Sequence, residues 1–210
     1  MYMEEETEKE KEKEKEEDKV MDSNLLHGGV DKEGKEQKEG KEIENERIEE
    51  ELLNDLWALY FHDPLNSDWN LSSYIRIEDI STVQGFWKAH DLLKSNVHLG
   101  MFFLMREYVF PCWDDPNNKD GGCISIKVLK NESLVFWEKM CIALLGETLL
   151  KEPSRAKLWS SVNGISTSPK KHFCIVKIWL KEAIDLAMFN FPPGFYGEIL
   201  YKANAENISG

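Results

Sequence analysis

Two tryptophans stand in stretches of sequence where a buried aromatic residue is not expected. Trp69 lies in the polar segment Asp68-Trp69-Asn70, and Trp113 follows Pro111 and precedes two aspartates. An indole ring offers a broad flat face at small entropic cost, so tryptophans on loops are candidates for stacking on planar ligands. The alternative is that each ring is a hydrophobic plug that closes its loop, and the residues alone leave that choice open.

The sequence contains no motif that would indicate a catalytic site. The motifs of phosphate-binding loops, dinucleotide-binding folds, serine hydrolases and zinc proteases are all absent. The five histidines are isolated from one another, and the four cysteines form no C-x-x-C pair. We therefore expect a binding protein and not an enzyme, with no cofactor, no metal and reduced cysteines.

Charge divides the chain near residue 50. Residues 1–50 hold 20 acidic and 10 basic residues, a net charge of −10 out of −13 for the whole chain, and all seven tryptophans follow this segment. So polar a segment cannot bury enough apolar surface to offset the entropy of ordering. We predict a disordered charged tail over residues 1–50 and one domain over residues 51–210.

Cellular placement follows from two features of the sequence. No apolar run approaches the roughly 18 residues that span a membrane. The acidic start is also the opposite of the positively charged leader of a signal peptide. We therefore expect a cytoplasmic protein with no membrane partner.

The elements that must position the loop tryptophans follow from hydrophobic periodicity. Helical spacing after Ser81, which we expect to be an N-cap paired with Gln84 in a capping box, predicts a helix. Two more helices are predicted over residues 133–146 and 181–189. Short or alternating apolar runs predict strands over residues 56–61, 74–80, 101–105, 123–129, 158–165, 173–180 and 197–202. Strands in small groups with helices between them predict an antiparallel α+β domain.

The tryptophans belong to an ordered series of motifs. These are Trp57-Ala58-Leu59-Tyr60, then Trp69, then Thr82-Val83-Gln84-Gly85-Phe86-Trp87, then Pro111-Cys112-Trp113-Asp114-Asp115 with Gly121-Gly122, then Phe136-Trp137 with Leu145-Gly146-Glu147, then Ile178-Trp179. Their order and spacing resemble the eukaryotic translation initiation factor 4E family over residues 51–180. The resemblance implies a curved antiparallel sheet with about three helices on its convex face and a cap-binding site in its concave face.

The resemblance also implies a ligand, the 7-methylguanosine cap of messenger RNA. The methylated base would be sandwiched between Trp69 and Trp113, with Trp179 against the N7 methyl group. Asp114 would accept hydrogen bonds from the guanine edge, although its side chain is shorter than the family's usual glutamate. Methylation at N7 makes the base cationic, so an indole face attracts it by cation–π interaction as well as by stacking. An acidic chain can therefore bind this nucleotide.

Recognition of the cap triphosphate departs from the family pattern. No arginine occupies the matching place between Val162 and His172, and an insertion lengthens this segment. Lys170 and Lys171 are our candidates by proximity, with Lys177 less favoured. The alternative is that they are ordinary solvated lysines.

A second implied surface lies on the helical side of the fold. There the family receives a partner helix with a Tyr-x-x-x-x-Leu-hydrophobic motif. The matching positions are Val83, Trp87, Glu138, Lys139 and Gly146. Lys139 replaces a glutamate of the family and reverses the charge that would pair with a partner's arginine. The alternative for Val83 and Trp87 is simple packing in the core.

Three functions remain open on this evidence. The leading one is an initiation factor that binds the cap of mRNA and recruits a scaffold factor to start translation. The second is a cap-binding translational repressor that does not engage the usual scaffold, which the Glu138-Lys139 departure favours. The third is an adaptor that has lost cap binding, which the missing arginine favours.

Overall fold

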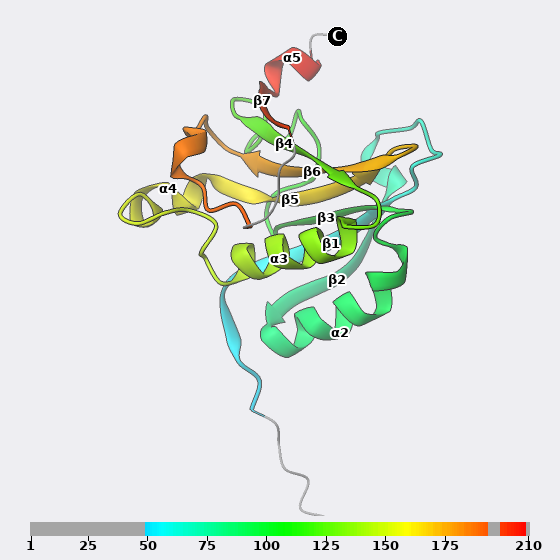
Figure 1. Ribbon diagram of the computed structural model, residues 1–210, viewed down its shortest axis with the longest axis horizontal. Coiled ribbons are helices and arrows are strands. Elements are labelled where there is room, and N and C mark those ends of the chain that lie inside the picture. Colours follow the sequence, from blue (N-terminus) through cyan, green and yellow to red (C-terminus); the bar gives the residue numbers. More distant parts are fainter. Residues whose placement is uncertain (1–48, 193–197, 209–210) are drawn as a thin grey trace, which may run out of the picture. The chain divides into compact units, whose positions relative to one another are not determined.

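A seven-stranded antiparallel sheet organises the part of the chain that the structure describes. The computed structural model describes residues 49–192 and 198–208, so nearly all of the predicted tail lies outside the described residues. The strands run in the order β2-β1-β3-β5-β6-β4-β7 (Figure 1). They are β1 (Leu52–His62), β2 (Tyr74–Thr82), β3 (Met101–Arg106), β4 (Gly122–Leu129), β5 (Val162–Pro169), β6 (Phe173–Leu180) and β7 (Ile199–Ala203).

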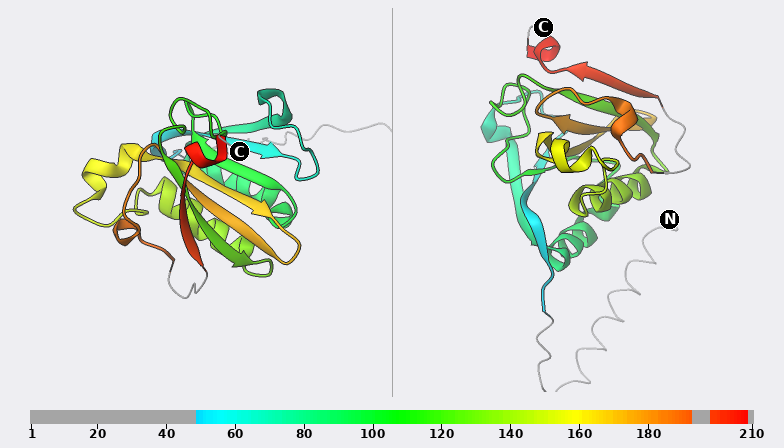
Figure 2. Two further views of the ribbon diagram at one scale, coloured as in Figure 1. Left: turned by 90° about the horizontal axis from the view of Figure 1, so that it is seen from above. Right: turned by 90° about the vertical axis from the view of Figure 1, so that its left-hand side faces the viewer.

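Two long helices cover one face of this sheet (Figure 2). They are α2 (Val83–Leu93) and α3 (Ser133–Leu145), while the short α4 (Arg155–Leu158) precedes β5 and the short α5 (Ala205–Ile208) follows β7. The sheet is curved and unclosed, which confirms the predicted fold. Among the helices of the described residues, none has the length and apolarity needed to cross a membrane.

Side chains of the central strands are buried on both faces of the sheet. In β3, Phe102 and Leu104 join the large core under α2 and α3, whereas Phe103 and Met105 join a smaller cluster on the opposite, concave face. Successive residues of a strand point to opposite faces. The same alternation in β6 directs Trp179 to the concave side.

A bulge contributes to the curvature of the sheet. The pairing of β5 with β6 shifts register between Val162 and Gly164. Gly164 has a φ of 156°, and an added Cβ would lie 2.4 Å from the carbonyl oxygen of Leu104. An extra residue in one strand of an antiparallel pair bends that strand and increases its twist.

Three local predictions were wrong. The strand expected over residues 158–165 is Val162–Pro169, because Trp159–Ser161 form a 3₁₀ turn. The N-cap of α2 is Thr82, whose hydroxyl accepts from the Gly85 amide, and not Ser81. Gln84 instead accepts a hydrogen bond from the Glu51 amide, which ties the start of β1 to the helix. The expected helix over residues 181–189 is reduced to the 3₁₀ turn Leu186–Met188, because Phe189 pairs in extended form with Leu150.

Gly121 marks a close approach between two backbones, which gives a test of the fold. A Cβ at this position would lie 1.9 Å from the carbonyl oxygen of Leu180. We expect Gly121→Ala to lower the free energy of unfolding by about 3 kcal/mol, the upper range for overpacking. Urea denaturation measures this change. Ser95→Ala, at an exposed position, serves as control, and its free energy of unfolding should stay within about 0.5 kcal/mol of the wild type. Equal unfolding midpoints for the two variants would contradict the close backbone approach at Gly121.

Candidate functional site

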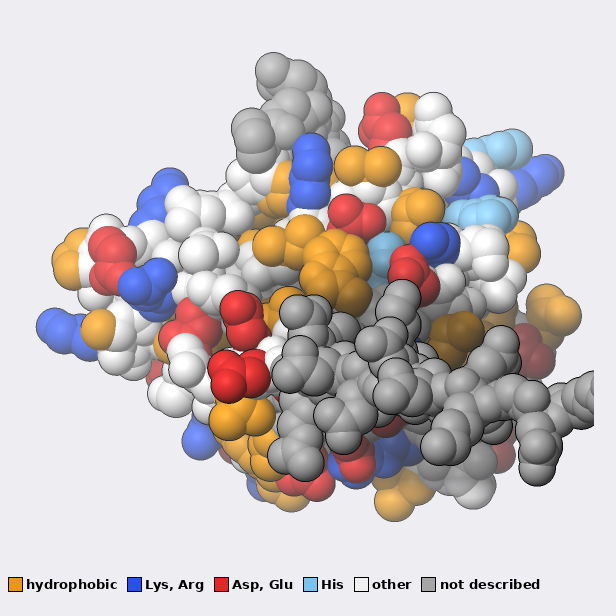
Figure 3. All heavy atoms as spheres, turned by 90° about the horizontal axis from the view of Figure 1, so that it is seen from below, with side chains coloured by type: hydrophobic (Ala, Val, Ile, Leu, Met, Phe, Trp, Pro, Cys, Tyr) orange, Lys and Arg blue, Asp and Glu red, His pale blue; other side chains and the backbone are white. Residues whose placement is uncertain are grey.

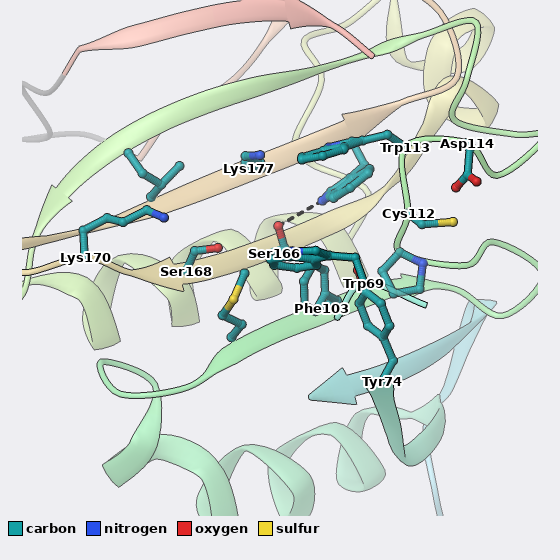
Figure 4. Close-up of a pocket in the computed structure, with 14 residues that line it drawn as sticks. Trp69, Tyr74, Phe103, Cys112, Trp113, Asp114, Ser166, Ser168, Lys170 and Lys177 are labelled. Atoms are coloured by element: carbon teal, nitrogen blue, oxygen red, sulfur yellow. Dashed lines mark hydrogen bonds between the residues drawn. The ribbon is translucent and has the colours of Figure 1, made fainter. Parts of the chain in front are cut away.

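A cavity of about 500 Å³ opens on the concave face of the sheet (Figure 4). Aromatic side chains and a few polar groups line it. The lining residues are Trp69, Tyr74, Met101, Phe103, Pro111, Cys112, Trp113, Asp114, Ser166, Ser168, Lys170, Ile175, Lys177 and Trp179. A mainly apolar hollow with a few placed polar groups is the usual form of a site for a small ligand.

Trp69 enters the cavity from the loop between β1 and β2. Its ring stacks on the imidazole of His62, with centroids 4.3 Å apart and planes 2° from parallel. His62 is fully buried and its Nε2 lies 2.8 Å from the carbonyl oxygen of Asp68. His62 does not line the cavity. Trp69, which is 50% exposed, therefore has one face supported by the protein and offers the other to a ligand.

The loop that carries Trp113 is fixed from inside by buried amide groups. The side-chain amide of Asn118 donates to the carbonyl oxygens of Phe110 and Cys112 at 2.9 and 2.8 Å. Its oxygen accepts from Asn163 on β5, and its backbone carbonyl accepts from Asn204 beyond β7, each at 2.8 Å. Three separate segments thus meet at one fully buried residue, through its side chain and its backbone carbonyl.

Asp115 completes the fixation of this loop. Its carboxylate accepts from the Phe110 amide at 3.2 Å and from the Asn117 amide at 2.8 Å. Of the two aspartates after Trp113, Asp115 is therefore bonded within its own loop, while Asp114 lines the cavity. This difference supports Asp114 as the residue that meets a ligand.

Trp179 on β6 also lines the cavity. It is only 3% exposed, and its Nε1 donates to the Ser166 hydroxyl at 2.9 Å (Figure 4). Because the indole nitrogen is satisfied by the protein, Trp179 offers a ligand carbon atoms and not a donor. Such a surface suits a methyl group.

The two ends of the cavity differ in charge. Lys170 and Lys177 lie at one end, and Asp114 lies at the other (Figure 4). Burial, reinforced by the nearby Asp114, raises the pKa of the Cys112 thiol to about 12. That thiol stays neutral near pH 7, so it adds no charge to the acidic end. The polarity fits a ligand with a cationic or donor-rich end and an anionic tail.

Most of the predicted site residues come together in this cavity. Trp69, Trp113, Asp114, Trp179 and Lys170 all line it, whereas Lys171 is exposed in the β5–β6 turn and is not among the lining residues. Lys177, the less favoured candidate, is half-buried and lines the cavity in place of Lys171. The reason is strand alternation, because residue 177 shares a sheet face with Trp179.

Sequence reasoning missed the residues that hold the tryptophans in place. His62 and Asn118 make no motif, and their roles depend on contacts with distant segments. The one available signal for His62 was its position seven residues before Trp69, at the end of an apolar strand.

The helical face carries the second set of predicted residues. Trp87 is 38% exposed and Val83 is half-buried on α2, while Lys139 and Gly146 are exposed on and after α3. Glu138 on α3 lies 3.6 Å from Nε2 of buried His90 on α2, so the two helices come close at this point. Ile142, one turn after Glu138 and 47% exposed, adds an apolar residue that we had not predicted. Figure 3 shows hydrophobic side chains bordered by acidic and basic ones on this face.

The chain belongs to the family described as Eukaryotic initiation factor 4E, whose model matches residues 52–189. It is 31% identical over 113 residues to the eukaryotic translation initiation factor NCBP of Oryza sativa subsp. japonica, covering 52% of this chain and 47% of that protein. It is 27% identical over 146 residues to initiation factor 4E-1 of Hordeum vulgare subsp. vulgare, covering 66% and 64%. The match thus spans about half to two thirds of the length of these relatives.

Solved structures share the fold. The complex of C. elegans eIF4E-3 with the 4E-binding protein Mextli and a cap analog aligns with a TM-score of 0.62 at 18% identity, covering 77% of this chain and 96% of that one. Ascaris suum eIF4E-3 with m7G cap aligns with a TM-score of 0.56 at 20% identity, covering 65% and 76%. At this identity the likeness concerns the fold alone.

Asn118 gives a test of how the Trp113 loop is held. Asn118→Ala removes the bonds from this side chain to the carbonyl oxygens of Phe110 and Cys112 and to the amide of Asn163. The Phe110 carbonyl keeps its bond from the Cys112 amide, and the Asn163 amide keeps its bond to the Asn117 carbonyl, whereas the Cys112 carbonyl loses the bond described for it. We expect a loss of roughly 2 to 3 kcal/mol in the free energy of unfolding. Amide hydrogen exchange of residues 110–118 should accelerate as well.

Asn117→Ala is the matched control for this test. Among the described residues, the Asn117 side chain bonds only to Asp115 of the same loop, at 3.1 Å, so its removal should change stability much less. Equal losses in the two variants would show that the buried amide cluster does not hold the loop.

Proposed function

We propose that this protein binds the 7-methylguanosine cap of mRNA in the concave cavity and acts in the initiation of translation without catalysis. The observation that carries the proposal is the pair of loop tryptophans, Trp69 and Trp113, that enter one cavity with Ser166 between them (Figure 4). Membership in the initiation factor 4E family supports the same ligand. Residues 51–210 then form the binding domain, and residues 1–50 are a charged tail.

The chemistry of the base matches the groups around the cavity. A cationic 7-methylguanine ring would be attracted to the electron-rich faces of Trp69 and Trp113, while its methyl group would meet the carbon surface of Trp179. Asp114 would accept hydrogen bonds from the guanine edge, and a carboxylate there favours guanine over adenine. The phosphates would extend toward Lys170 at the basic end.

Initiation further requires a partner, for which the helical face is suited. We assign Val83, Trp87, Glu138, Lys139 and Gly146 to a surface that receives a helical motif of a scaffold factor. The C. elegans eIF4E-3 structure includes a 4E-binding protein, which supports a partner of this kind. The second candidate, a cap-binding repressor, is favoured by the exposed cation at Lys139.

Removal of either loop tryptophan tests the binding proposal. We expect Trp69→Ala and Trp113→Ala each to weaken binding of 7-methyl-GTP by roughly 1 to 3 kcal/mol, or about 5- to 150-fold, because one stacking face is lost. Isothermal titration calorimetry measures this change, with unmethylated GTP as the ligand control.

Trp87→Ala is the matched protein control, since Trp87 is a similarly exposed tryptophan on α2. Its affinity for 7-methyl-GTP should equal that of the wild type. Unchanged affinity in both Trp69→Ala and Trp113→Ala would disprove the sandwich.

Lys139 gives a test of the partner surface. We expect Lys139→Glu to raise the affinity for a helical peptide with a Tyr-x-x-x-x-Leu-hydrophobic motif and an arginine by about two- to fivefold, as for an exposed ion pair. Fluorescence anisotropy of the labelled peptide measures the change. Lys171→Glu, an equal charge reversal in the β5–β6 turn, should have no effect. A similar gain from both variants would mean that the peptide responds only to net charge.

A further inference from the structure

A lysine of the cavity lies against Trp113, one of the two rings that we assign to the methylated base. Lys177 lies on β6, two residues before Trp179, and so on the same face of the sheet. Its Nζ lies 5.4 Å from the centroid of the Trp113 ring and 6.0 Å from that of Trp179 (Figure 4). These distances fall within the range of a cation–π interaction.

The ammonium of Lys177 has few other favourable contacts. Among the described residues, no carboxylate forms an ion pair with it. Burial lowers the pKa of Lys177, and the charges of Lys170 and Lys202 lower it further. Cys123 faces it as a thiol whose pKa burial raises to about 12, so that group is neutral near pH 7. The aromatic rings are therefore the main stabilising surroundings of this charge.

Two cations cannot share one face of Trp113. A 7-methylguanine base that stacks on this ring meets the ammonium of Lys177, and like charges at such short range repel strongly in a partly buried site. The ammonium must leave the ring when the base enters. The affinity for the ligand then depends on the new partner that the ammonium of Lys177 finds.

A nucleotide brings its own partner for the displaced ammonium. Its phosphates carry negative charge, and phosphate oxygens accept charge-assisted hydrogen bonds from lysine. The basic end of the cavity also contains Lys170 and the hydroxyl of Ser168, which line it on the same side as Lys177. A nucleoside without phosphate provides nothing in exchange.

We propose that Lys177 makes entry of the methylated base conditional on an attached phosphate, so that the cavity selects capped nucleotides over free 7-methylguanosine. The lysine covers Trp113 in the free protein, leaves it when the base stacks, and binds the phosphate in the complex. This inference rests on the proposed cap-binding function and adds a specificity-determining residue to it.

Three ligands separate the two effects of the lysine. The full chain is titrated by calorimetry with 7-methylguanosine, 7-methyl-GMP and 7-methyl-GTP, and Lys177→Met is compared with the wild type. Methionine keeps much of the apolar stem without the charge. We expect the variant to bind 7-methylguanosine roughly tenfold more tightly and 7-methyl-GTP roughly tenfold more weakly than the wild type.

Lys170→Met is the matched control, because Lys170 lines the same end of the cavity, is exposed, and has no cation–π contact within the described part of the chain. It should lose affinity for 7-methyl-GTP and leave 7-methylguanosine unchanged. Lys177→Arg retains a cation that stacks on indole and binds phosphate, so it should preserve the wild-type order of affinities. That result also shows that position 177 tolerates substitution without loss of the fold.

The outcomes distinguish failure of this inference from failure of the cap-binding proposal. A wild-type protein that binds 7-methyl-GTP no better than GTP overturns both. A wild-type protein that prefers 7-methyl-GTP, together with a Lys177→Met variant that binds 7-methylguanosine no more tightly than the wild type, overturns the role of Lys177 alone. Where wild-type binding of the nucleoside lies below detection, the absence of detectable binding to Lys177→Met overturns that role equally.

Discussion

Three buried amide side chains, Asn118, Asn163 and Asn204, connect segments that are far apart in the sequence. A buried amide without partners is costly, so each of these groups is stable only while the other segments are in place. The cluster thereby couples the loop of Trp113 to β5 and to the chain beyond β7. Trp69 depends in a similar way on His62, which stacks on its ring. Both tryptophans are thus positioned by buried neighbours, and side chains that are already positioned lose less entropy when a planar ligand binds.

Much of the fold followed from local patterns, because alternation and helical spacing directly reflect which faces are buried. The order of aromatic motifs then gave the family and the two loop tryptophans. What sequence could not provide were contacts between distant residues. Asn118 and His62 have no local signature, and the choice between Lys171 and Lys177 depended on the register of β5 and β6. The short turn at Leu186–Met188 replaced a predicted helix for the same reason, since the pairing of Phe189 with Leu150 overrides local propensity.

The charge of the cavity differs from that of the chain as a whole. The net charge of −13 repels nucleic acid at long range, and most of it lies in the first 50 residues. Within the cavity, the aromatic faces, Asp114 and the lysine end provide short-range groups of different kinds. Binding of this type is selective because affinity comes from a few local contacts and not from a broad basic surface.

The alternation of side chains across the sheet has a consequence for how this protein can change over time. In β3 and β6, neighbouring positions serve opposite faces, so a substitution that alters the hollow leaves the packing under α2 and α3 almost untouched. Mutational effects at sites without shared contacts are close to additive. Substitutions in the cavity and substitutions on the helical face can therefore accumulate in this protein nearly independently of each other.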